Sequence, residues 1–88
     1  MGPMFAGRRI EATDPTRARY RITATPIKEV VDAFGLEQAR RFFDLYVAEA
    51  LSEDWEIASY TPGDVLPRVF TFEHPKFGFA EIKLEEVA

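Results

Sequence analysis

The chain contains no cysteine, and this absence excludes several classes of site at once. Without thiols there is no disulfide framework and no thiolate nucleophile, and the usual zinc sites that combine cysteine with histidine are also excluded. His74 is the only histidine, and between Glu73 and Pro75 we interpret it as a turn residue rather than a catalytic base or metal ligand. We therefore expect no metal, no cofactor and a reducing, cytoplasmic environment.

Long hydrophobic runs are also absent, because the apolar stretches are only a few residues long, whereas a membrane-crossing helix needs about 18. The N-terminus has no basic segment followed by an apolar one, as a secretory signal would have. The five glycines are scattered singly, so the chain has no glycine-rich loop to bind phosphate. From these absences we expect no contact with a membrane and no enzymatic activity.

At 88 residues the chain is long enough for one domain and too short for two. A domain of this size has a thin core, because it buries only about 60–65% of the surface that its unfolded chain exposes. Yet 47% of the residues are apolar and 14% are aromatic, so we expect some apolar surface to remain for a partner. We assign residues 8–88 to the single domain and residues 1–7 to a flexible lead or an expression remnant.

The net charge of −4 argues against a domain whose whole surface binds nucleic acid, although the charge is unevenly distributed. Residues 1–41 carry eight basic and five acidic side chains, whereas residues 42–88 carry three basic and ten acidic ones. Charge that is segregated in this way can steer a partner toward one face of a protein.

Two N-terminal segments alternate apolar with polar or charged residues, at Arg8–Thr13 and at Arg17–Thr25. This period of two predicts a pair of half-buried strands. The intervening Asp14-Pro15-Thr16 is typical of a tight turn, since aspartate can bond the backbone two residues on and proline presets φ. The sequence therefore predicts an N-terminal β-hairpin.

Two helices are expected next, one on each side of Gly35. Thr25 followed by Pro26 is typical of a helix start. Four apolar residues then recur at helical spacing, namely Ile27, Val30, Val31 and Phe34. Gly35 tolerates the left-handed conformation that ends many helices. The second and longer helix, from Leu36 to Leu51, has a wide apolar stripe opposite a charged face, which predicts that it packs on a sheet.

The C-terminal third predicts three further strands, at Trp55–Tyr60, Leu66–Glu73 and Phe79–Val87, which are rich in residues that favour a pleated sheet. Thr61-Pro62-Gly63-Asp64 fits a type II turn, and residues 74–78 form the second connecting loop. The three strands would form an antiparallel meander. The expected fold is thus α+β, in the order ββααβββ, with the helices packed on one face of the sheet.

The first candidate for a binding surface is a row of arginines. Arg17, Arg19 and Arg21 fall at a period of two and project from one face of a strand, with Arg9 beside them on the preceding strand. Such a row can contact an acidic protein partner or the phosphates of a nucleic acid. The structural alternative, which we favour, is a solvated strand face that pairs across the hairpin with Glu11.

The second candidate is the aromatic group of the C-terminal strands. A buried core is the default interpretation for these residues, because aromatics dominate cores as well as interfaces. Phe77 and Phe79 are different, since they lie beside the turn at Pro75, where a thin core covers side chains poorly. We predict that Phe77 and Phe79 belong to a contact surface. The whole group comprises Trp55, Tyr60, Phe70, Phe72, Phe77 and Phe79.

The resulting hypothesis is a small non-enzymatic protein-binding module, such as an adaptor, a regulator or an inhibitor, for which a second copy of the chain is one candidate partner. It rests on the surplus of aromatic surface and on the segregated charge. The alternative is a nucleic-acid-binding protein that uses the face carrying Arg17, Arg19 and Arg21. Binding through phosphates weakens steeply with salt, so salt dependence separates the two hypotheses.

Overall fold

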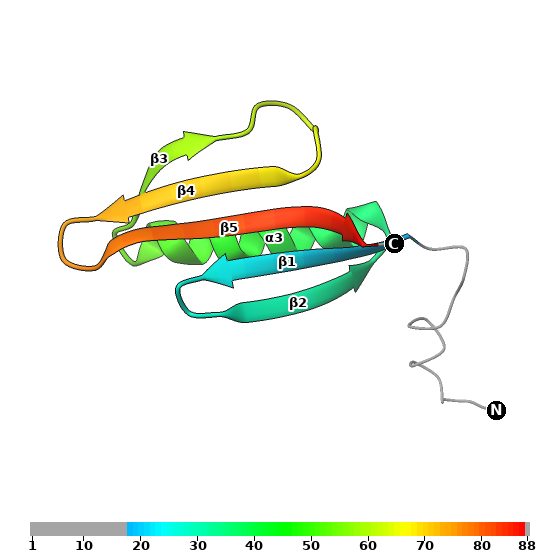
Figure 1. The fold of residues 1–88 in the computed structure, drawn as a ribbon, viewed down its shortest axis with the longest axis horizontal. Coiled ribbons are helices and arrows are strands. Elements are labelled where there is room, and N and C mark those ends of the chain that lie inside the picture. The colour runs from blue at the N-terminus through cyan, green and yellow to red at the C-terminus, as the bar shows by residue number, and fades with distance from the viewer. Residues whose placement is uncertain (1–17, 88) are drawn as a thin grey trace.

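The computed structural model describes residues 18–87, in which a single helix crosses one face of a five-stranded antiparallel sheet (Figure 1). The strands lie in the order β2-β1-β5-β4-β3, so that β2 and β3 form the two edges. The elements are β1 (Arg19–Thr25), β2 (Glu29–Phe34), α3 (Leu36–Ser52), β3 (Glu56–Tyr60), β4 (Arg68–His74) and β5 (Gly78–Val87).

The strand β1 lies inside the sheet, where it pairs with β2 on one side and with the central strand β5 on the other. Its alternating sequence divides its side chains between the two faces of the sheet. Tyr20, Ile22 and Ala24 are buried under α3, whereas Arg19 and Arg21 project from the opposite face. We call the face without a helix the open face.

The helix α3 begins directly after β2, because Gly35 turns the chain between them. Gly35 has φ 90°, a conformation that side chains disfavour, and its N–H donates to the carbonyl oxygen of Ala18 at 2.7 Å. The helix then buries Ala39 and Phe43 completely against the sheet. Its predicted apolar stripe is therefore the face that packs on the strands.

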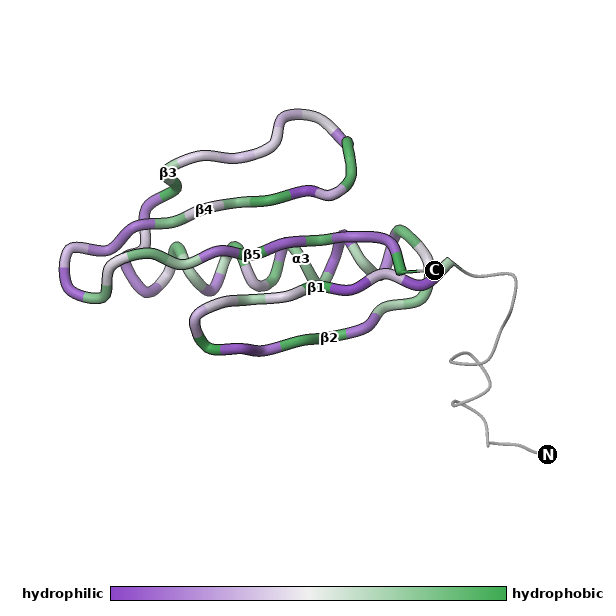
Figure 2. The backbone as a smooth tube through the Cα atoms, in the orientation of Figure 1, coloured by the Kyte–Doolittle hydropathy of each residue, from purple (hydrophilic) through white to green (hydrophobic). Residues whose placement is uncertain are grey.

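The core lies between α3 and the sheet. Apolar and polar residues alternate along β5 (Figure 2), so that Ile82 and Leu84 enter this layer while Lys83 does not. The Phe43 ring meets the Phe70 ring edge to face, with 5.3 Å between the ring centroids. The fully or almost fully buried residues are Tyr20, Ile22, Ala24, Ala33, Ala39, Phe43, Phe72, Ile82 and Leu84.

The predicted fold of a hairpin, two helices and a separate three-stranded meander is wrong, because the described chain has one helix and all five strands belong to one sheet. The segment expected to be the first helix is the edge strand β2. Its Val30 and Val31 are β-branched and favour a pleated surface, and its backbone pairs with β1 from end to end. Pro26 lies in the β1–β2 turn, and Gly35 precedes a helix instead of ending one.

The first strand of the predicted N-terminal hairpin, Arg8–Thr13, lies outside the described residues. The described part of its second strand is β1, which has a hydrogen-bonded neighbour on each side, β2 and β5. The hairpin that β1 forms is with β2, which follows it in sequence. Residues 1–7, assigned to a lead, also lie outside the described part.

The other predicted segments coincide with elements of the structure. The helix expected at 36–51 corresponds to α3, and the strands expected at 55–60, 66–73 and 79–87 correspond to β3, β4 and β5. Gly63, expected at the third position of a turn, has φ 71° in the loop between β3 and β4. No helix among residues 18–87 is long and apolar enough to cross a membrane.

The position of Phe43 at the centre of the core makes its truncation a test of this packing. Phe43→Ala removes a ring that is 0% exposed and should cost about 3–5 kcal/mol in the free energy of unfolding, because it leaves a cavity that the sheet cannot close. Urea denaturation measures the loss. Leu45→Ala, at a helix position that is 62% exposed, is the control and should change the same quantity by less than about 1 kcal/mol. Equal losses in the two variants would contradict the described orientation of α3.

Candidate functional site

A pocket of about 480 Å³ opens on the helix side of the sheet, at the carboxyl end of α3. It forms because the β4–β5 hairpin extends farther than the neighbouring β1–β2 hairpin (Figure 1). The pairing of β1 with β5 starts at Glu81, so residues 78–80 of β5 extend beyond β1 together with β4. The helix ends over this extended part of β5, and the β1–β2 turn forms the opposite wall of the pocket.

Small residues keep the pocket from being filled. Ala24 on β1, Ala50 on α3 and Ala80 on β5 all line it, at positions where longer apolar side chains would close the space between helix and sheet. Aromatic side chains form much of the remaining wall, namely Tyr46, Trp55, Phe72 and Phe77. The lining is therefore mainly apolar, as in most sites that bind organic groups.

The end of α3 holds Trp55 at the pocket. Asp54 adopts φ 71°, its N–H donates to the carbonyl oxygen of Leu51 at 3.3 Å, and the Trp55 N–H donates to that of Ala50 at 3.1 Å. These two bonds form a Schellman motif, which satisfies the last carbonyl groups of a helix and turns the chain sharply. The motif fixes the position of Trp55 relative to the end of α3.

Two rings from the β4–β5 turn region, His74 and Phe77, pack against Trp55. The Trp55 and Phe77 rings are stacked with an interplanar angle of 28° and 6.3 Å between centroids. The His74 ring lies 5.2 Å from Trp55 and 4.7 Å from Phe77, and its Nδ1 accepts the backbone N–H of Lys76 at 3.0 Å. His74 thus takes part in the β4–β5 turn, and this packing gives the pocket an aromatic wall.

Three carboxylates line the same pocket, from Glu29 on β2 and from Glu49 and Glu53 at the end of α3. Within residues 18–87 none of the three has an ion-pair partner. Burial raises the pKa of the Tyr46 phenol above its ordinary value, and its interaction with Glu29 and the nearby charge of Glu49 raise this pKa further. The pocket therefore combines an aromatic wall with unpaired negative charge.

A second hollow of about 280 Å³ adjoins the pocket and lies between α3 and the edge strand β2. Tyr46 and Glu49 line both spaces, so the hollow and the pocket are neighbours at these residues. The rest of the second lining is apolar, with Val31, Phe42 and Leu45. The pocket and the hollow together follow the exposed edge of the sheet.

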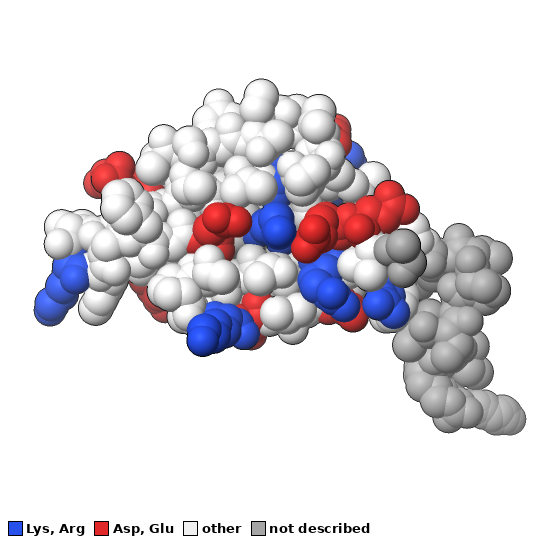
Figure 3. Space-filling model, in the orientation of Figure 1, with Lys and Arg blue, Asp and Glu red and all other residues white. Residues whose placement is uncertain are grey.

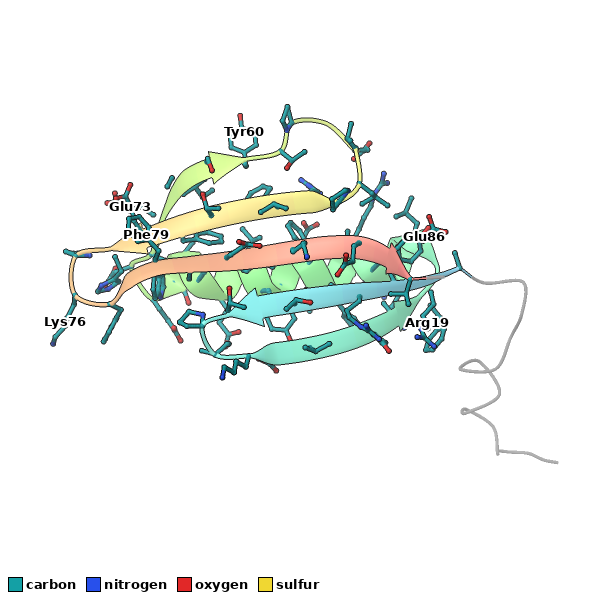
Figure 4. The ribbon with its side chains drawn as sticks, in the orientation of Figure 1. Arg19, Tyr60, Glu73, Lys76, Phe79 and Glu86 are labelled. Carbon is teal, nitrogen blue, oxygen red and sulfur yellow. The ribbon has the colours of Figure 1, made fainter. Side chains whose placement is uncertain are left out.

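Of the two phenylalanines predicted to form a contact surface, Phe77 lines the pocket and Phe79 does not. Gly78, with φ 89°, separates them and turns Phe77 to the helix side. Phe79 lies opposite Glu73 on the open face, and Figure 4 shows the two side chains close together near the end of the β4–β5 hairpin. Both phenylalanines are exposed, Phe77 by 66% and Phe79 by 75%.

The predicted arginine row lies on the open face as far as the structure describes it. Arg21 faces Asp32 on β2 and donates to its carboxylate at 2.9 Å, while Arg19 lies 3.9 Å from the same carboxylate. On the other side of β1, Arg21 lies opposite Glu85 of β5 in the strand register. The remaining members, Arg9 and Arg17, and the expected partner Glu11 lie outside the described residues.

Basic and acidic side chains intermingle over the centre of the open face (Figure 3). The Arg21 guanidinium holds the pKa of Asp32 below its ordinary value near 3.8, mainly through their hydrogen bond. The same bond raises the pKa of Arg21. Arg21 therefore has an acidic partner within the sheet, Asp32.

Three of the pocket residues, Glu29, Glu49 and Glu53, were not among the predicted site residues, and Trp55 was assigned by default to the core. One signal was present in the helix, because positions 46, 49, 50 and 53 recur at helical spacing and all four line the pocket. No local pattern in the sequence indicates which residues of β2, β4 and β5 line the pocket. These residues come close to α3 only through the order of strands in the sheet.

Among residues 18–87, no group of three or more histidine or acidic side chains is arranged to hold a metal ion. Comparison with protein-family models, with curated proteins and with solved structures found no significant match. The geometry of the chain itself therefore carries the functional argument.

The depressed pKa of Asp32 predicts how stability depends on pH. Because the folded state binds this proton less readily than the unfolded chain, the contribution of the Arg21–Asp32 pair is present above the ordinary pKa and is lost as the pH falls through the folded pKa. Asp32→Asn removes this dependence. Between about pH 5 and pH 2, urea midpoints should therefore fall more for the parent chain than for Asp32→Asn. Parallel pH profiles would contradict the pairing.

Proposed function

We propose that the chain is a small non-enzymatic module that binds a protein partner by docking a segment of that partner in the pocket at the end of α3. The observation that carries the proposal is the pocket itself, whose apolar lining stays open between helix and sheet instead of being closed by larger side chains. Its volume falls in the range of about 300–1,000 Å³ that is usual for ligand sites.

The surroundings of the pocket support a protein segment as the occupant. Ile27 and Leu45 are 68% and 62% exposed, and they line the pocket and the adjoining hollow respectively. Exposed apolar groups of this kind, grouped around a concave site, are typical of surfaces that bind other proteins. The edge strand β2 beside them also presents backbone groups on its outer side to a docked segment.

Nucleic-acid binding by the arginine face receives less support. Arg19 and Arg21 lie beside Asp32, and Arg21 is also opposite Glu85, so phosphates would have to compete with carboxylates that are already in place. The pocket is negatively charged and would repel a phosphate backbone. Both observations favour a protein partner.

The two phenylalanines around Gly78 supply a matched test. In a pull-down from lysate of the source cell, Phe77→Ala should reduce capture of the partner at least about tenfold, because it removes one wall of the pocket. Phe79→Ala removes an equally exposed ring from the opposite face and should leave capture unchanged. Light scattering on the same samples shows whether the partner is a second copy of the chain.

Two results would overturn the proposal. One is the absence of any captured protein and of self-association for the parent chain. The other is equal capture by Phe77→Ala and the parent chain, which would move the binding surface away from the pocket. Circular dichroism of each variant verifies that the sheet and the helix are retained, so that a lost interaction is not a lost fold.

A further inference from the structure

We propose that the segment bound in the pocket is basic, and that it seats an arginine side chain against Trp55 and Phe77 among the carboxylates of Glu29, Glu49 and Glu53. This inference rests on the proposed function and names the chemistry of the partner. It follows from the charge of the pocket, from its aromatic wall and from the shape of the adjoining hollow.

Among residues 18–87, no basic side chain forms an ion pair with the carboxylates of the pocket. Glu49 and Glu53 lie at the carboxyl end of α3, where the helix dipole is itself negative, and the last turn of α3 has no basic residue. Glu29 adds a third carboxylate from β2. The lysines of the two adjacent turns, Lys28 and Lys76, do not line the pocket. A bound cation would therefore meet three carboxylates in a lining that contains no lysine or arginine.

The aromatic wall favours a guanidinium over other cations. A planar guanidinium stacks on aromatic faces and is weakly hydrated, so it enters an apolar pocket at lower cost than an ammonium group does. The chain already uses this chemistry internally. The Arg68 guanidinium carbon lies 5.1 Å from the centroid of the Phe43 ring and 5.3 Å from that of Phe70, partly buried beneath α3.

The adjoining hollow indicates a peptide rather than a free guanidine compound. It neighbours the pocket at Tyr46 and Glu49, which line both spaces, and is otherwise lined by Val31, Phe42 and Leu45. A segment lying along the β2 edge can therefore seat arginine in the pocket and a neighbouring apolar side chain in the hollow. A compound that has only the guanidinium would leave the hollow empty.

Trp55 is the only tryptophan of the chain, so its fluorescence reports directly on the pocket. The probe is a blocked pentapeptide with a central arginine between two leucines, and its matched control carries citrulline, which has the same shape without the charge. A third arm is arginine amide alone. The full chain is titrated with each compound at low and at physiological salt.

The arginine peptide should give a saturable change in Trp55 fluorescence, and the citrulline peptide should bind at least about tenfold more weakly, a difference expected for one cation in an aromatic and acidic site. Binding of the arginine peptide should weaken with salt. Arginine amide should also bind at least about tenfold more weakly, because it leaves the apolar hollow empty. Equal affinity of the citrulline peptide overturns the charge assignment, and equal affinity of arginine amide overturns the peptide assignment.

The double variant Glu49→Gln with Glu53→Gln should weaken binding of the arginine peptide at least about fivefold and leave the affinity for the citrulline peptide unchanged. Glu37→Gln, at the opposite end of the same helix and with a side chain that is 91% exposed, is the matched control and should change neither. If capture of the cellular partner depends on Phe77 but no arginine peptide binds, the proposed function stands and the basic occupant is overturned. If the peptide binds and no protein is captured, the proposed function fails by itself.

Discussion

A single helix covers one face of a five-stranded sheet, and the helix is narrower than the sheet. The rest of the structure depends on this difference in width. A 17-residue helix is about 25 Å long and about 10 Å wide, whereas five strands at about 4.8 Å spacing span about 24 Å. The helix therefore does not cover all five strands, and it packs mainly against β1, β2 and β5. The edge strand β3 is exposed along its whole length, and the space beyond the carboxyl end of α3 stays open as the pocket.

The open face is mainly polar, although Phe79 is exposed on it. With no second helix among the described elements, the side chains of that face meet water, and the sheet balances their charge by pairing neighbouring strands. Arg21 between Asp32 and Glu85 is the clearest case. Arginines on such a face stabilise the sheet surface modestly, and their presence in a row is weak evidence for a phosphate partner.

Charge is balanced on the open face and unbalanced at the pocket, and this contrast distinguishes the two candidate surfaces. On the open face Arg19 and Arg21 of β1 lie beside Asp32 of β2, and Lys83 lies 3.7 Å from Glu85 on the same strand, so these three cations have partners within the sheet. At the pocket three carboxylates gather at the negative end of a helix without a base in its last turn. Unfavourable arrangements of this kind persist in proteins where binding compensates for them.

The sequence by itself determined the elements whose periodicity was long enough to be unambiguous. The apolar stripe of residues 36–51 and the alternation along residues 79–87 each extend over at least two full turns or four pleats, so only one secondary structure buries them. The spacing of Ile27, Val30, Val31 and Phe34 fits a helix on its own, but the segment is short, and only its pairing with β1 decided that it is a strand. The pocket was decided wholly by tertiary structure. Glu29, Glu49, Trp55 and Phe77 lie on four separate segments, and no local pattern can predict that strand order brings them together around one cavity.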